Sequence, residues 1–264
     1  MSDWLTATQN FDDHGYVIIK GALARSEAIA LSELAEERWR RRPNASEHYL
    51  HEFDFVNVEP RFRSLVAVRS VLGVVTQMLG HNVHVYHCHL TVTQGHAAAT
   101  GERPVPDYEW HQDGGTLIGD LGGAGAPRVS IKAGFLLSDV PSPQHGPTVM
   151  LPRGHCGPLP PAGHEHTWAG AVPITGHAGD CVVFDNRTWH SRSPNLTDQP
   201  RVLASVAYAP RWIRSRDRLA PPDLADVDPT SAMAQLLGHA ESARGCHVDK
   251  ADDGLPLLRF MNQN

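Results

Sequence analysis

Long hydrophobic runs are missing from this sequence. No apolar stretch approaches the roughly 18 residues that a membrane-spanning helix requires. Residues 1–10 also lack the basic and then apolar order of a secretory signal peptide. We therefore expect a cytoplasmic protein without a membrane partner.

Charge of one sign is not concentrated anywhere in the chain. The formal net charge is only −6, and no block of five or more like charges occurs. The basic footprint of a nucleic-acid-binding protein is therefore absent, and we expect no nucleic-acid partner. Arg38 and residues 40–42 form a small basic cluster, which we interpret as the solvated end of a helix.

Cysteine is scarce, and its four positions are not paired. None of them belongs to a C-x-x-C motif, so neither a zinc ribbon nor a disulfide framework is indicated. We expect reduced, mostly buried thiols. The cysteines are Cys88, Cys156, Cys181 and Cys246.

The order of the expected elements predicts the fold class. Helical patterns come first, over 25–42 and over 61–79, and short β-rich runs bounded by turn residues follow. This order excludes an alternating βαβ chain and predicts a mainly β barrel or sandwich. The β-rich runs are 83–93, 108–113, 129–139, 147–151, 180–185 and 201–209.

A chain of 264 residues with 41% hydrophobic residues is compatible with one large domain. We expect a single domain over 1–264. Its parts are a helical support at about 24–80, a barrel core at about 83–212, and a C-terminal helix and tail at 217–264. Within these bounds we also expect a short strand over 16–20, a helix near Ser231–Glu241, and long loops over 95–107, 114–127 and 153–179.

Histidine is abundant, with 17 residues, and two histidines occur in a metal-binding pattern. In a strand, residues two apart face the same side, so His111 and Asp113 would point into the barrel together. An H-x-D pair alone is a weak signal, because a surface histidine and aspartate at the end of a strand give the same pattern. His190 follows the apolar run 181–184 and would reach the mouth of the same barrel.

Two histidines and one carboxylate form the facial triad of non-haem Fe(II) oxygenases. Zinc is the rival metal, because the same ligands occur in hydrolytic zinc sites. The helical H-E-x-x-H motif of zinc proteases is absent. A zinc-dependent hydrolase and a non-catalytic metal- or ligand-binding cupin-like module remain as alternatives.

Arg201 follows His190 by eleven residues and begins the apolar run 202–208. A guanidinium that points into a barrel needs an anionic partner, because an unpaired buried charge is costly. A carboxylate matches it in bidentate geometry. A salt bridge to Asp198 is the alternative to a bound dicarboxylate.

Together these motifs resemble the phytanoyl-CoA dioxygenase family over roughly residues 10–212. The resemblance rests on the order of several segments, each of which is unspecific alone. The segments are FDDHGYVIIKGAL at 11–23, HQDGG at 111–115, LSD at 137–139, HGP at 145–147, LPRGH at 151–155, and 190–201 with its Pro194, Asn195 and Asp198.

The resemblance implies a double-stranded β-helix, a jelly-roll barrel with flanking N-terminal helices. It also implies an oxygenase that uses Fe(II), 2-oxoglutarate and O2, with iron on His111, Asp113 and His190 and 2-oxoglutarate on Arg201. Because Asp113 is retained, the resemblance favours hydroxylation, desaturation, epimerisation or cyclisation over halogenation.

Two positions depart from the family pattern. Arg192 stands where the family usually has a small hydroxyl residue, and it would contact the cosubstrate or face the substrate. Gly134 replaces a common aromatic residue, and Lys132 would share its face. Lys132 is a candidate contact to the cosubstrate or substrate, and an outward, solvated lysine is the alternative.

The expected substrate is a small molecule, and an intermediate of natural-product biosynthesis is favoured, bound by a monomer or homodimer. An acyl-CoA is not favoured, because no obvious basic pocket for its phosphates is present. Aromatic candidates near the site are more often core residues. Candidate substrate contacts are Trp110, Phe55, Asn57, His87 and Trp189.

Overall fold

The computed structural model describes residues 2–42, 49–95, 109–114, 119–122, 125–156, 168–217, 224–238 and 255–263.

The largest element is a six-stranded sheet in which every neighbouring pair of strands is antiparallel. The longest pairing joins β3 to β9, with a register irregularity between Val85 and His87. In spatial order the strands are β1 (Tyr16–Ile19), β7 (Cys181–Asp185), β4 (Ile131–Leu136), β9 (Arg201–Pro210), β3 (Val83–Thr93) and β2 (Tyr49–Phe53).

A second, three-stranded antiparallel sheet consists of β6 (Val172–Pro173), β5 (Thr148–Met150) and β8 (His190–Arg192). It packs against the β7 end of the large sheet through Met150, Ile174, Val182 and Phe184. Two facing antiparallel sheets confirm the expected mainly β, jelly-roll class.

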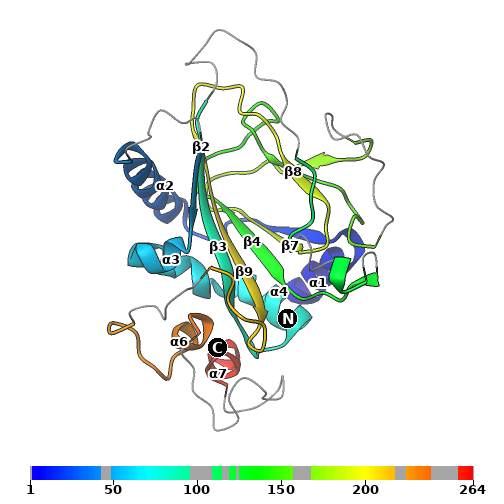
Figure 1. Ribbon diagram of the computed structural model, residues 1–264, viewed down its shortest axis with the longest axis vertical. Helices are drawn as coiled ribbons and strands as arrows, with labels where there is room; N and C mark the ends of the chain where they lie inside the picture. Colours follow the sequence, from blue (N-terminus) through cyan, green and yellow to red (C-terminus); the bar gives the residue numbers. More distant parts are fainter. Residues whose placement is uncertain are drawn as a thin grey trace.

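Helices cover the outer face of the large sheet, while the small sheet lies on its other side (Figure 1). Gln235 fixes the C-terminal helices to the start of β3: its amide donates to His81 O and Val83 O and accepts from Leu257 N. The helices are α1 (Ser2–His14), α2 (Arg25–Arg40), α3 (Phe55–Val58), the 3-10 helix η1 (Pro60–Ala67), α4 (Arg69–Leu79), α6 (Ala232–Leu236) and α7 (Pro256–Asn262).

Strand alternation explains why the two faces of the sheet differ. Successive side chains of β9 point to opposite faces. Val202, Ala204, Val206 and Tyr208 enter the core beneath the helices. Arg201, Leu203 and Ser205 face the small sheet, on the side that carries the cavity described below. The helices thus stabilise one face and leave the other for polar side chains.

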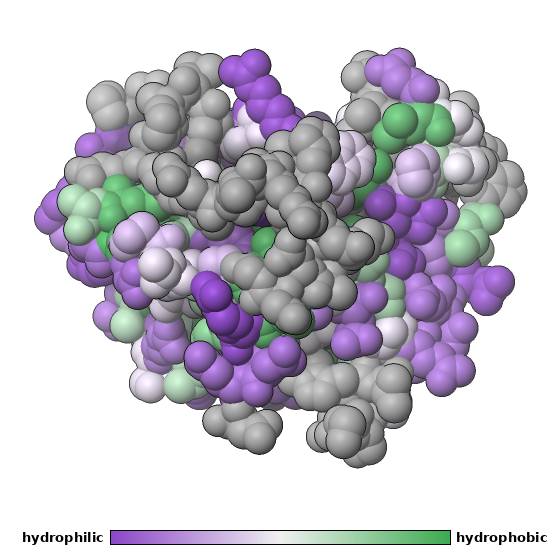
Figure 2. All heavy atoms as spheres, turned by 90° about the horizontal axis from the view of Figure 1, so that it is seen from below, coloured by the Kyte–Doolittle hydropathy of each residue, from purple (hydrophilic) through white to green (hydrophobic). Residues whose placement is uncertain are grey.

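Hydrophobic residues are scattered among polar ones on the face shown in Figure 2. No single helix among the described residues is long and apolar enough to span a membrane. The pair η1 and α4, which is bent by 56°, reaches the needed length and apolarity only when both helices are counted together.

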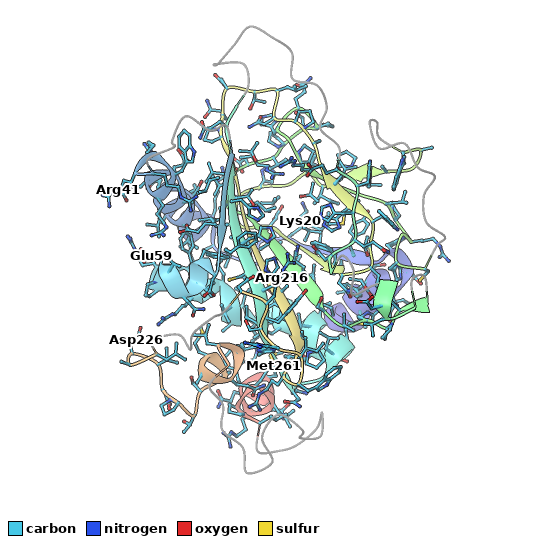
Figure 3. The ribbon with its side chains drawn as sticks, in the orientation of Figure 1. Lys20, Arg41, Glu59, Arg216, Asp226 and Met261 are labelled. Carbon is cyan, nitrogen blue, oxygen red and sulfur yellow. The ribbon has the colours of Figure 1, made fainter. Side chains whose placement is uncertain are left out.

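Most of the expected elements are confirmed within one to three residues, including β1, β3, β7, β9 and the end of α4 at Gly80. The arginine cluster is indeed the end of α2, where Arg41 pairs with Glu37 and points away from the sheet (Figure 3). Ser231 caps α6 by accepting from Ala234 N. Cys88 and Cys181 are buried cysteines, whereas Cys156 is exposed.

Several expectations were wrong. The helix expected over 61–79 divides at Val68 into η1 and α4. The described part of 108–113 is not a regular strand; it makes one isolated bridge, at His111. The elements α1, β2, β8 and α7 were not expected. Residues 96–108 and 239–250 lie outside the described residues.

A buried carboxylate holds the end of β7 in place. Asp185 is fully buried and accepts hydrogen bonds from Arg128 Nε at 2.6 Å and Arg187 Nη2 at 2.7 Å. Arg128 also reaches Asp12 of α1. Burial by itself raises the pKa of Asp185, but the two guanidinium groups keep it below its usual value. The turn that leads to His190 therefore begins at a fixed, charged anchor.

We predict that Asp185→Asn lowers the free energy of unfolding by about 2–3 kcal/mol in urea at neutral pH. Removing one partner of a buried ion pair costs about 3–5 kcal/mol, and the loss is smaller here because both guanidinium groups still reach water. Asp13→Asn, a matched change at an exposed carboxylate of α1, should change stability by less than about 0.5 kcal/mol. Equal stabilities of the two variants would contradict the anchoring role.

The same anchor predicts an acid-side loss of stability. A carboxyl group with a depressed folded-state pKa stabilises the protein above its unfolded-state pKa of about 3.9, and this stabilisation is lost as the pH falls below that value. Urea unfolding at a series of pH values should show a shallower acid-side decline for Asp185→Asn than for the wild type. An unchanged decline would exclude Asp185 as a contributor.

Candidate metal centre and cavity

Two backbone hydrogen bonds bring the histidines of the expected triad together. His111 N donates to His190 O and His190 N donates to His111 O, both at 3.0 Å, in an antiparallel bridge. The two imidazole rings consequently lie 4.2 Å apart between centroids. Residues separated by most of the barrel sequence become neighbours through this bridge.

Asp113 completes the group from the turn that follows the bridge. Its Oδ2 lies 3.9 Å from His190 Nε2. One ligand atom from each of His111, Asp113 and His190 lies within 4.8 Å of the others. No other group of three or more His, Cys, Asp or Glu among the described residues meets this condition. The structure therefore brings together the three residues that the sequence singled out.

Backbone carbonyls set the orientation of both imidazoles. His111 Nδ1 lies 2.8 Å from Glu109 O, and His190 Nδ1 lies 2.9 Å from Thr188 O. A carbonyl oxygen only accepts, so each Nδ1 carries the proton and each Nε2 keeps a free lone pair. Hydrogen bonds of this kind from the non-ligating nitrogen are typical of metal-bound histidines.

The protonation states of His190 and Asp113 also favour binding of a metal cation. Burial lowers the pKa of His190 to about 3, so the ring is neutral near neutral pH. Burial raises the pKa of Asp113, but the Lys132 ammonium and both histidines outweigh it and hold the pKa below the usual value. A neutral imidazole and an ionised carboxylate are the forms that bind metals.

Lys132 is the nearest cation to this group. Its Nζ lies 2.7 Å from both carboxylate oxygens of Asp113, but it makes a hydrogen bond only to Oδ1. Asp113 Oδ2 is buried without a hydrogen-bond partner among the described residues. This carboxylate oxygen and the Nε2 lone pairs of the two histidines are together suited to bind a divalent metal ion. The Lys132 side chain is 7% exposed and faces inward from β4, not outward into solvent.

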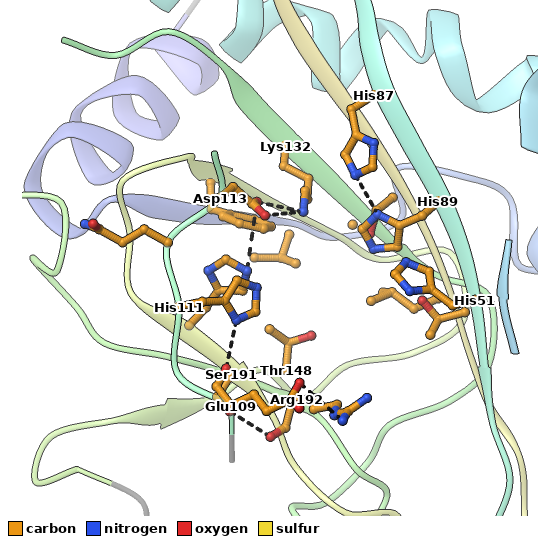
Figure 4. A pocket seen from close by; sticks show the side chains of 18 of the residues that line it. His51, His87, His89, Glu109, His111, Asp113, Lys132, Thr148, Ser191 and Arg192 are labelled. Atoms are coloured by element: carbon orange, nitrogen blue, oxygen red, sulfur yellow. Dashed lines mark hydrogen bonds and ion pairs between the residues drawn. The ribbon is translucent and has the colours of Figure 1, made fainter. Parts of the chain in front are cut away.

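A cavity of about 460 Å³ opens in front of the three residues, between the two sheets (Figure 4). The large sheet contributes side chains from β2, β3, β4, β7 and β9, and the small sheet contributes Thr148, Ser191 and Arg192. This volume lies in the usual range for small-molecule sites.

Arg201 lines the same cavity from the first position of β9. It is 5% exposed, and its Nη1 donates to Gly146 O at 2.6 Å. Arg192 lies nearer the rim, with a side chain 35% exposed and Nη2 at 3.2 Å from Glu109. Together with Lys132, these guanidinium groups make the cavity suitable for an anionic ligand.

The substrate contacts expected from sequence are distributed unevenly. Among them only His87 lines the cavity. Phe55 is fully buried in the helix–sheet core against Phe62, and Asn57 bonds to Asp54. Trp110 and Trp189 both pack on Trp168.

Other cavity residues were not proposed from sequence as contacts. His51 and Arg216 line the cavity, and Asp217 contacts His87 behind it. His51 sits on β2, which the sequence pattern did not predict as a strand. Arg216 and Asp217 follow β9, and their contacts with Tyr86 and His87 span about 130 residues of sequence. The available signal was the alternation along 83–93, which places His87 and His89 on the same face of β3.

Comparisons with known proteins agree with this geometry. The family profile described as phytanoyl-CoA dioxygenase (PhyH) matches residues 11–203. The L-proline trans-4-hydroxylase of Streptomyces griseoviridis is 26% identical over 215 residues, which is 70% of this chain and 75% of that protein.

Solved structures show the same fold at low sequence identity. HygX from Streptomyces hygroscopicus, with nickel and 2-oxoglutarate bound, has a TM-score of 0.64 at 16% identity and covers 84% of this chain and 92% of its own. The epimerase SnoN, in complex with Fe3+, alpha-ketoglutarate and nogalamycin RO, has a TM-score of 0.62 at 20% identity. The match covers 79% of this chain and 84% of the SnoN chain. Since the family profile spans well over half of the sequence, the chain belongs to the phytanoyl-CoA dioxygenase family.

Proposed function

We propose that this protein is an Fe(II)- and 2-oxoglutarate-dependent oxygenase that oxidises a C–H bond of a small metabolite. The observation that carries the proposal is a single cavity that contains both His111, Asp113 and His190 and the buried Arg201. Membership of the family and the ligands bound in HygX and SnoN support the same function.

The metal would be held by His111 Nε2, His190 Nε2 and a carboxylate oxygen of Asp113. Three protein ligands on one face leave further coordination positions for exogenous ligands. An Fe(II) ion bound there supplies O2 activation, with the additional electrons coming from the oxidative decarboxylation of 2-oxoglutarate to succinate and CO2.

The cations of the cavity have separate roles in this proposal. Arg201 is the most deeply buried guanidinium of the cavity and would bind the distal carboxylate of 2-oxoglutarate, because its planar fork matches a carboxylate. Lys132 balances the charge of Asp113 and, because it lines the cavity, would be a second cation for the cosubstrate. Arg192, beside Glu109 at the rim, would face either the cosubstrate or the incoming substrate.

We place the substrate among small metabolites, with an intermediate of natural-product biosynthesis favoured. The relatives include an L-proline hydroxylase, the epimerase SnoN and the carbocyclase SnoK from nogalamycin biosynthesis. Hydroxylation, epimerisation, cyclisation and desaturation all share the initial C–H oxidation that this site supports.

We predict that purified protein with Fe(II), ascorbate and a panel of small metabolites converts 2-oxoglutarate to succinate in air. His111→Ala should reduce the succinate rate by more than about 100-fold, because even residues behind a metal ligand contribute 10- to 100-fold. His14→Ala, at the exposed end of α1, is the matched control and should retain the wild-type rate. Hydrolysis of a substrate by the zinc-loaded protein, without succinate, would contradict the proposal.

We further predict that Arg201→Ala raises KM for 2-oxoglutarate by about 30-fold or more, with a smaller effect on KM for the substrate. Losing one partner of a buried, hydrogen-bonded charge pair costs at least about 2 kcal/mol. Arg201→Lys should recover part of the loss, because it restores the charge but not the bidentate geometry. Steady-state kinetics at saturating Fe(II) measure both values, and Arg61→Ala on η1, which pairs with nearby Glu59, serves as the control. An unchanged KM for 2-oxoglutarate in Arg201→Ala would refute the assignment.

A further inference from the structure

Three histidines form the cavity wall opposite the proposed metal centre. His87 and His89 lie on β3 and His51 lies on β2, and all three line the cavity (Figure 4). The His51 and His89 rings meet edge to face at 4.8 Å between centroids. Neither the metal centre nor Arg201 accounts for this wall.

Two of these histidines belong to a hydrogen-bonded chain that begins at a buried carboxylate. Asp217 lies 2.7–2.8 Å from His87 Nδ1 and accepts a further hydrogen bond from Cys88 N at 2.7 Å. His87 Nε2 then lies 3.3 Å from His89 Nδ1. The side chains of His87 and Asp217 are only 5% and 6% exposed, so the chain is shielded from water up to His89.

The carboxylate fixes the direction of the first hydrogen bond, and a neutral His87 ring fixes the direction of the second. An ionised carboxylate only accepts, so His87 Nδ1 must donate to Asp217. In a neutral His87 ring, Nε2 is then an acceptor, and His89 Nδ1 must donate to it. Burial, together with nearby Lys132 and His87, lowers the pKa of His89 and keeps that ring neutral. His89 Nε2 is therefore left with a lone pair, and it has no hydrogen-bond partner among the described residues.

We propose that the chain Asp217–His87–His89 is a substrate-recognition device that presents His89 Nε2 to the reaction cavity as a fixed hydrogen-bond acceptor. This inference rests on the proposed function, because it assigns the cavity to the substrate of an oxygenase. The class of substrate that it selects carries a hydroxyl, amine or amide N–H group opposite the C–H bond that faces the metal.

The acceptor at His89 Nε2 favours substrates that carry a hydrogen-bond donor over those that lack one. A substrate that lacks the donor leaves a half-buried acceptor unsatisfied, which is more costly than the small net gain of an ordinary hydrogen bond. A counterpart in which the O–H, or every N–H, is replaced by a methyl group adds bulk and removes the donor. We expect such counterparts to lose about 10- to 100-fold in kcat/KM.

The nearly isosteric variant Asp217→Asn reverses the donor and acceptor roles of each hydrogen bond between residues 217, 87 and 89. The amide oxygen can still accept from Cys88 N, while the amide NH2 donates to His87 Nδ1. His87 then carries its proton on Nε2 and donates to His89 Nδ1, which moves the His89 proton to Nε2. The variant converts the acceptor in the cavity into a donor without removing either histidine.

The first arm of the test observes the protons directly. Protein labelled with 15N-histidine, loaded with diamagnetic Zn(II) and 2-oxoglutarate, is examined by long-range 1H–15N NMR, with His87→Gln and His89→Gln used for assignment. We expect the Nδ1–H tautomer of His89 in the wild type and in the control Asp13→Asn, and the Nε2–H tautomer in Asp217→Asn. An Nε2–H tautomer of His89 or an imidazolium at His87 in the wild type would overturn the proposal.

The second arm uses the metabolite panel of the succinate assay, with each hydroxyl or amine compound paired with a counterpart in which the O–H, or every N–H, is methylated. We expect the unmethylated compounds to be favoured by about 10- to 100-fold in the wild type, and the preference to fall below about 2-fold or reverse in Asp217→Asn. A preference of equal size in both proteins would overturn the recognition role. Absence of succinate with every compound, alongside the expected tautomers, would instead count against the oxygenase assignment and leave the acceptor geometry standing.

Discussion

The pair of backbone hydrogen bonds between residues 111 and 190 is the constraint on which the site depends. They join the segment before the first glycine-rich turn to β8, and they place two imidazoles side by side. The carbonyls two residues earlier in each segment then orient the rings. Asp185, with its two arginines, fixes the turn that leads into the second segment. The geometry of the proposed metal ligands is thus a consequence of main-chain pairing, reinforced by a buried ion cluster.

Because side chains alternate along each strand, the two faces of the large sheet differ in polarity and in role. The outer face buries aliphatic and aromatic side chains beneath the helices. The inner face carries Arg201, Lys132 and the histidine chain, which would be unfavourable in an apolar core. Facing inward around a cavity, Lys132 and His87 pair with carboxylates, and the cations are available to anionic and polar ligands. The apolar side supplies stability, so the inner side is free to be polar and chemically selective.

Sequence alone predicted the fold class, the grouping of His111, Asp113 and His190, and the inward position of Arg201, because these depend on local patterns and on the order of motifs. It predicted His111 and Asp113 for an incomplete reason, since residue 111 belongs to an isolated bridge instead of a strand. Phe55 was proposed near the substrate but lies in the core, because the short helix α3 turns it inward. Asp217 could not be predicted, because its partner lies 130 residues away and no periodicity marks it.

The most direct test of the central claim is the visible absorption of the anaerobic protein titrated with Fe(II) and 2-oxoglutarate. The structure predicts a metal-to-ligand charge-transfer band that saturates at one Fe(II) per chain, is absent in Asp113→Ala, and requires a higher 2-oxoglutarate concentration in Arg201→Ala. Absence of the band in the wild-type protein, with Fe(II) bound elsewhere or not at all, would contradict a shared iron and 2-oxoglutarate site in this cavity.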